Sequence, residues 1–141
     1  MNDQTQALLS IDGLTVRFGG LTAVDDLSFQ VLPGRIHALI GPNGAGKSTT
    51  FNCISRYYDP TGGAISFAGA DVTRHRAADM AALGVARTFQ NLELFNDLTV
   101  EENVLLGTYS YGARGLARLL RRPVAANREF AHDLLERVGL I

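Results

Sequence analysis

The stretch of sequence that decides the fold is Gly41-Pro42-Asn43-Gly44-Ala45-Gly46-Lys47-Ser48. It matches the phosphate-loop pattern G-x-x-x-x-G-K-[S/T] at every fixed position. Residues 35–40, just before it, are mostly apolar and predict a short buried strand. After it, Phe51 and Ile54, with Tyr57 and Tyr58 a turn further on, recur at helical spacing. The loop is therefore expected between a strand and a helix start, as a phosphate-binding loop requires.

Such a loop binds a triphosphate mainly through its backbone. Gly44 and Gly46 can adopt conformations closed to other residues and carry no side chain that would block a phosphate. Lys47 is expected to place its ammonium on the β- and γ-phosphates, and the Ser48 hydroxyl is expected to ligate Mg²⁺. A glycine-rich turn with a solvated lysine is the alternative, but it leaves the flanking strand and helix unexplained. The candidate nucleotide-binding residues of the loop are Asn43, Gly44, Ala45, Gly46, Lys47, Ser48 and Thr49.

Composition limits the possible functions. The chain has 141 residues, enough for one domain core, and a formal net charge of −1, which does not favour nucleic acid as a partner. The single cysteine, Cys53, excludes an internal disulfide and fits a reducing compartment. No apolar run reaches the roughly 20 residues that span a bilayer, so a membrane role is expected to come through a partner. His37, His75 and His132 lack the spacing of metal ligands.

Alternating apolar residues predict an antiparallel sheet in the first half of the chain. Residues 7–18 alternate, with a bulge or turn expected at Asp12-Gly13, and residues 27–31 alternate again. A turn at residues 59–63 precedes residues 64–67, which predict another short strand able to pair with the first ones.

Between the sheet and the last third of the chain, a helix and a strand are expected. Thr73 is a candidate N-cap for a helix through Leu83, and Gly84 stands where a helix C-cap belongs. Residues 85–89 predict a strand that ends at Gln90.

The last third is expected to be helical. Residues 99–102, Thr-Val-Glu-Glu, form a capping box that opens a helix through about Leu106. Residues 116–120 resume helical spacing until Pro123. One apolar stripe then follows, made of Phe130, Leu134, Leu135 and Val138. The sequence thus predicts an α/β fold: a P-loop NTPase core with an antiparallel β subdomain in residues 1–92, then the start of an α-helical subdomain in residues 93–141.

Three features in order give a closer resemblance: a strand-end aromatic, the loop GPNGAGKST, and VARTFQ downstream. Together they closely resemble the ATP-binding subunit of ABC transporters, over essentially the whole chain. RFGGLTAVDDLSF, GVARTFQNLELFNDLTVEENV and LLERVGL are similar to the subunit that serves branched-chain amino-acid importers. The implied cofactors are ATP and Mg²⁺.

The resemblance also implies roles for single residues. Phe18 matches the aromatic that stacks on adenine, and Val24 is expected to pack near the sugar or base. Otherwise Phe18 is simply the last inward residue of its strand. Gln90 matches the Q-loop glutamine that reaches Mg²⁺ and the attacking water, so Lys47 and Gln90 are the catalytic candidates and Ser48 and Gln90 the metal-binding ones.

The family's partners are implied too: transmembrane permease subunits and a second ATP-binding subunit, at the inner face of the cell membrane, with no nucleic acid. The signature sequence, catalytic glutamate and switch histidine of the family do not occur in this sequence. We therefore expect the N-terminal part of a longer subunit, inactive as an ATPase alone. Two alternatives stay open: a binding-only fragment, and a non-transport ATPase of the same superfamily. The apolar and acidic residues 90–104 favour docking to a membrane partner over the second of these.

Overall fold

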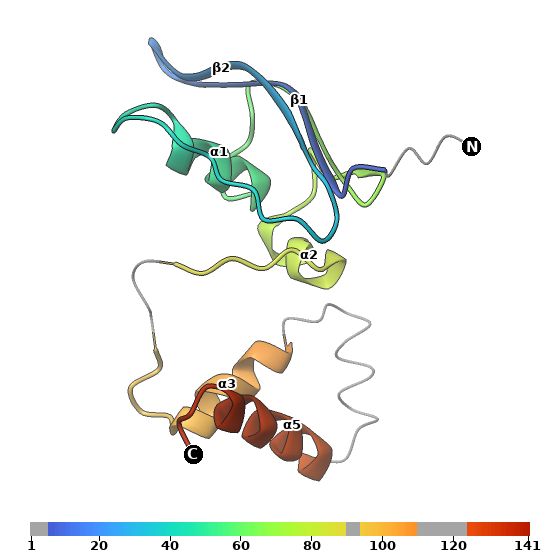
Figure 1. Cartoon of the computed structure of the whole chain (residues 1–141). Helices are drawn as coiled ribbons and strands as arrows, with labels where there is room; N and C mark the ends of the chain where they lie inside the picture. The colour runs from blue at the N-terminus through green and yellow to red at the C-terminus, as the bar shows by residue number, and fades with distance from the viewer. Residues whose placement is uncertain (1–5, 90–93, 110–123) are drawn as a thin grey trace, which may run out of the picture. The chain divides into compact units, whose positions relative to one another are not determined.

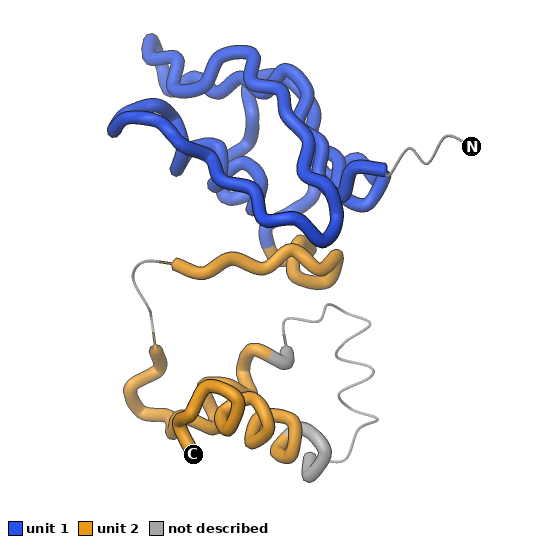
Figure 2. The backbone as a smooth tube through the Cα atoms, in the orientation of Figure 1, with its two compact units in different colours: residues 1–77 blue, residues 78–141 orange. Residues whose placement is uncertain are grey.

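The computed structural model describes residues 6–89, 94–109 and 124–141 (Figure 1). The chain divides into two compact units, residues 1–77 and 78–141 (Figure 2). An antiparallel sheet and the phosphate-loop helix make up the first unit, whereas the described elements of the second are helices. The predicted domain boundary between residues 92 and 93 lies outside the described residues and stays a prediction.

The sheet of the first unit has the strand order β2-β1-β3-β4, and each neighbouring pair is antiparallel. The strands predicted at residues 7–18, 27–31 and 64–67 are confirmed, and the last of them pairs with the first. The strand bounds are β1 Leu9–Phe18, β2 Leu21–Val31, β3 Gly62–Phe67 and β4 Ala70–Asp71.

A bulge in β1 sets which of its residues enter the core. Side chains alternate along a strand, so Ile11 and Leu14, three residues apart, would ordinarily face opposite sides of the sheet. The pairing of β1 with β2 shifts between these two residues, where Gly13 has a φ of +60°. As a result Ile11, Leu14 and Val16 are all buried, each at 2% exposure or less. The predicted bulge is confirmed, and it aligns the apolar face of β1.

The helix α1, Lys47–Ile54, follows the phosphate loop and contacts β2 (Figure 1). Its Thr50 and Cys53 are buried, and burial raises the pKa of the Cys53 thiol. The predicted helix is confirmed, but it ends before Tyr57 and Tyr58, which lie exposed in the turn beyond it.

Two predicted strands are wrong for the residues described. Residues 35–40 and 85–89 have no strand structure, and Ile36 and Ile40 are 103% and 87% exposed. Both segments have the apolar composition of buried strands. A strand also needs a neighbouring strand that forms hydrogen bonds with its backbone. In the described part of the chain, no strand pairs with either segment.

Thr73 was predicted to cap a helix, and this is also wrong. The helix α2 begins later and spans Ala77–Met80, followed by a 3₁₀ turn, Ala81–Leu83. The Thr73 hydroxyl instead accepts the N–H of Ile65 at 2.8 Å and donates to the carbonyl of the same residue at 3.3 Å. The Thr73 hydroxyl therefore extends the hydrogen bonding of β3. Gly84 ends the 3₁₀ turn with a φ of +97°, as predicted.

The capping box of the second unit is confirmed and opens α3, Val100–Tyr109. The Glu102 carboxylate accepts hydrogen bonds from the N–H and the hydroxyl of Thr99 at 2.8 and 2.9 Å. In return, the Glu102 N–H donates to the Thr99 hydroxyl at 3.2 Å. The Asn103 side chain joins the same helix start to the preceding turn, because its amide donates to the carbonyls of Phe95 and Leu98 at 3.1 and 3.2 Å.

A pH effect follows from this box. The hydrogen bond from the Thr99 backbone N–H and, to a smaller extent, the one from the Thr99 hydroxyl lower the pKa of Glu102 below its ordinary value. The box therefore stabilises α3 above the ordinary glutamate pKa, and this stabilisation is lost as the pH falls through the lower folded value. We expect far-UV circular dichroism to show helix loss over that acidic range in the wild type. Glutamine does not titrate, so Glu102→Gln should not show this pH-dependent loss of helix. Identical curves of helix content against pH for the two proteins would contradict the prediction.

The last helix, α5, spans Val124–Arg137 and packs on α3. Among its described side chains Ala131 and Leu135 are buried. Phe130, Leu134 and Val138 are exposed, so the predicted apolar stripe is buried only at Leu135. The helix predicted at residues 116–120 lies outside the described residues. None of the helices described is long and apolar enough to span a membrane.

Candidate nucleotide-binding site

The phosphate loop is shaped by a close approach between Gly46 and β2. Gly46 caps the N-terminus of α1 with a φ of +78°, a conformation that side chains with a Cβ rarely adopt. A Cβ added there would overlap the carbonyl oxygen of Ala23 and lie 2.9 Å from Cγ2 of Val24. Only glycine therefore fits between the loop and the strand.

The strand is irregular at the point of contact. On β1, Val16 pairs with Val24 but the next residue, Arg17, pairs with Thr22, so Ala23 is the extra residue of a further bulge. The bulge lies where β2 meets Gly46, and Val24 beside it is buried at 8% exposure. Val24 thus lies beside Gly46 of the phosphate loop, and its predicted place near the sugar or base stays a prediction.

Lys47 reaches back across its own loop. Its ammonium donates to the carbonyl oxygens of Gly41 and Pro42 at 2.7 and 2.6 Å. A second turn of the loop is closed by the Ala45 N–H, which donates to Pro42 O at 3.2 Å. Lys47, the only cation of the 41–48 loop, is thus held against the loop. When a triphosphate binds, its phosphate oxygens would replace the two carbonyl oxygens as hydrogen-bond partners of the ammonium.

The start of α1 suits an anion. Gly46 gives no side-chain cap, and the first turn of this described helix carries no acidic residue. Its leading N–H groups and partial positive charge are therefore not offset by a nearby carboxylate. Gly44 has a φ of +86° and open space around it, and Ser48 is exposed at the helix start. This donor set fits a triphosphate, and the Ser48 hydroxyl fits Mg²⁺, which prefers oxygen ligands.

Phe18, the predicted stacking residue, ends β1 and is 47% exposed. Its ring meets that of Tyr58 edge to face, with 5.4 Å between the ring centroids and 78° between the planes. The alternative of an inward-facing core residue does not suit this exposure. Gln90 lies outside the described residues, so its predicted role stays a prediction.

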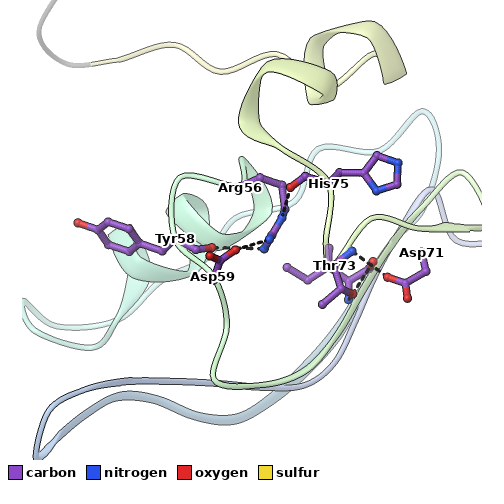
Figure 3. A network of polar contacts seen from close by, with 7 residues as sticks. Arg56, Tyr58, Asp59, Asp71, Thr73 and His75 are labelled. Atoms are coloured by element: carbon purple, nitrogen blue, oxygen red, sulfur yellow. Dashed lines mark hydrogen bonds and ion pairs between the residues drawn. The ribbon is translucent and has the colours of Figure 1, made fainter.

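Sequence reasoning missed Ala23, Arg56 and Tyr58. Arg56 is 7% exposed and follows α1, and its guanidinium donates to the carbonyls of Tyr58 in the turn and of His75 (Figure 3). No pattern marks a lone arginine as buried. The adjacent tyrosines were noticed only for their spacing, although two aromatic residues just past a phosphate-loop helix could have been weighed as part of the site.

Known proteins match this chain closely. It is 41% identical to the high-affinity branched-chain amino acid transport ATP-binding protein LivG of Escherichia coli K12, over 97% of this chain and 56% of LivG. The ribose import ATP-binding protein RbsA 1 of Streptomyces avermitilis is also 41% identical, over 94% of this chain and 24% of its own length. The chain thus spans about half the length of LivG and of the related BraF of Pseudomonas aeruginosa.

The fold matches as well. The ADP conformation of MJ1267, an ATP-binding cassette of an ABC transporter, aligns with a TM-score of 0.80 and 31% identity, over 96% of this chain and 55% of that one. The predicted α/β fold of the P-loop NTPase class is therefore confirmed. Residues 24–141 match the ABC transporter family, and the chain belongs to that family.

Proposed function

We propose that this chain binds Mg-ATP at the phosphate loop. The observation that carries the proposal is the loop itself: Gly46 is fitted against β2, and the Lys47 ammonium is held at the loop carbonyls. Lys47 would bind the β- and γ-phosphates, Ser48 the metal and Thr49 the α-phosphate. Asn43, Gly44 and Ala45 would offer backbone N–H groups to the same phosphates. When bound, Mg²⁺ would supply positive charge that neutralises the phosphates.

The fuller function proposed is that of an ATP-binding subunit that energises branched-chain amino-acid import by ATP binding and hydrolysis. Such a subunit would work with transmembrane permease subunits and a second ATP-binding subunit, at the inner face of the cell membrane. Gln90 would position the attacking water, and the expectation that these 141 residues alone do not turn over ATP stays a prediction. The match to LivG supports this function, and the match to RbsA 1 makes a sugar the competing substrate.

Uptake assays separate the two substrates. Deleting the gene in its host should lower the uptake of radiolabelled leucine, isoleucine and valine and leave ribose uptake unchanged. Loss of ribose uptake alone would contradict the amino-acid assignment without touching ATP binding. A plasmid copy with Lys47→Ala serves as the control, because it should fail to restore uptake where the wild-type copy succeeds.

Phe18 gives a second test of the proposed site. Phe18→Ala should weaken ATP and GTP binding alike, each by about 1–3 kcal/mol, because a ring face stacks on either purine without reading its edge. Calorimetric titration with both nucleotides measures the effect. Unchanged affinity for ATP would show that Phe18 is not part of the base site.

A further inference from the structure

Phe18 does not stand alone at the end of β1. Tyr58, from the turn after α1, contacts it edge to face, with the ring centroids 5.4 Å apart. The two residues are 47% and 40% exposed, so ring surface remains available on both. An edge-to-face pair of this kind has a preferred geometry and restricts the tilt of each ring.

The turn that carries Tyr58 is tied to the end of β1. The Thr61 N–H donates to the carbonyl of Thr15 at 2.8 Å, and the Thr61 hydroxyl accepts the N–H of Arg17 at 2.9 Å. These two bonds join the turn to the residues that lead directly into Phe18. The positions of the two rings are therefore linked through backbone as well as through their contact.

A buried arginine fixes the other side of the same turn. The Arg56 side chain is 3% exposed, and its Nε donates to the carbonyl of His75 at 3.0 Å (Figure 3). Its Nη1 and Nη2 donate to the Tyr58 carbonyl and to the Asp59 carboxylate at 3.4 and 2.5 Å. Figure 3 shows the Tyr58 ring directed away from this guanidinium. The network thus holds the backbone of Tyr58 and leaves its ring to meet Phe18.

We propose that Tyr58 is a positioning residue for the nucleobase. Its ring holds the Phe18 ring at a fixed tilt, so that the open face of Phe18 is ready to stack on a purine before the nucleotide arrives. Pre-ordering of this kind raises affinity because less side-chain freedom is lost on binding. The inference rests on the nucleotide site proposed above and adds a residue to its base-binding end.

The exposure of Tyr58 argues against a purely structural role. A ring that keeps 40% of its surface in water gains less from burial than a core aromatic does. The turn is already held by the bonds of Arg56 and Thr61, neither of which involves the tyrosine ring. Removing the ring should therefore leave the turn and the phosphate loop in place.

The test compares a ligand that has a base with one that has none. Calorimetric titrations of the 141-residue chain would use Mg-ATP and magnesium tripolyphosphate. Tyr58→Ala should weaken Mg-ATP binding roughly 2- to 12-fold, the factor that corresponds to ordering one side chain on binding. Tripolyphosphate binding should not change. Tyr58→Phe, which keeps the ring, should bind Mg-ATP as the wild type does, whereas Tyr58→Leu, which keeps only apolar bulk, should resemble Tyr58→Ala.

A double variant completes the test. If Tyr58 acts through Phe18, adding Tyr58→Ala to Phe18→Ala should cost little further affinity. Wild-type affinity of Tyr58→Ala, with a clear loss in Phe18→Ala, would overturn this inference and leave the nucleotide site standing. An equal loss for Mg-ATP and tripolyphosphate would also overturn it, because the ring would then act on the phosphate loop. Absence of Mg-ATP binding by the wild type would overturn the proposed function itself.

Discussion

Replacing Gly46 with alanine is expected to lower the free energy of unfolding of the nucleotide-free chain by about 2–5 kcal/mol. A left-handed conformation costs an alanine about 1–2 kcal/mol. The added Cβ would also press on the Ala23 carbonyl and on Val24, and overpacking of this kind costs typically about 1–3 kcal/mol. The backbone of β2 cannot move aside cheaply, because Thr22 and Val24, on either side of Ala23, are both paired with β1.

Gly44→Ala is the matched control for this effect. Gly44 has a similar φ, +86°, but nothing lies within 4 Å of the position of an added Cβ. Gly44→Ala should therefore lower the free energy of unfolding only by the cost of the left-handed conformation, about 1–2 kcal/mol. Urea titrations without nucleotide compare the two variants, and equal losses of stability would contradict the close approach of the loop to β2.

Replacing Lys47 with alanine is expected to weaken Mg-ATP binding by about 1.5–3 kcal/mol, the range for hydrogen bonds to a charged group. The loss stays within this range because the ammonium already bonds the carbonyls of Gly41 and Pro42 in the free chain. Binding of a triphosphate exchanges those partners for phosphate oxygens. Calorimetric titration of the two proteins with Mg-ATP measures the difference.

AMP is the control ligand for this prediction. It lacks the β- and γ-phosphates, so Lys47→Ala should change its affinity far less than that of Mg-ATP. An equal affinity of wild type and Lys47→Ala for Mg-ATP would remove Lys47 from the site. Equal losses for both ligands would instead indicate that the substitution damages the loop as a whole.

Features set by neighbouring residues could be predicted from the sequence. The phosphate loop and the helix after it depend on a short continuous pattern. The bulge near Gly13 was visible because the apolar alternation of β1 changes phase there. The capping box at Thr99 is likewise a local device, since both of its partners lie within one helical turn.

Features that depend on distant partners could not be predicted in the same way. Residues 35–40 and 85–89 carry a strand-like composition, but composition does not specify which strand would pair with them. Thr73 is a good N-cap residue by type, yet its hydroxyl bonds Ile65 on a neighbouring strand instead. In each case a tertiary contact, or the lack of one, decided the local structure.

The site shows the same division. Its proposed phosphate-binding half follows from a continuous stretch of sequence, whereas its proposed base-binding half is assembled from separate segments. Tyr58 meets Phe18 only because the turn after α1 is bonded to the end of β1 and to a buried arginine. Phe18 and Tyr58 are 40 positions apart in the sequence, so no spacing rule could have paired them.

The most direct test of nucleotide binding at the phosphate loop is an NMR titration of the ¹⁵N-labelled chain with Mg-ATP. The account predicts saturable amide shifts that are largest from Gly41 to Thr49, accompanied by shifts at Phe18 and Val24. Lys47→Ala should need more nucleotide to reach the same end point. Absence of saturable shifts in the loop, or shifts confined to other segments, would contradict the assignment of the site.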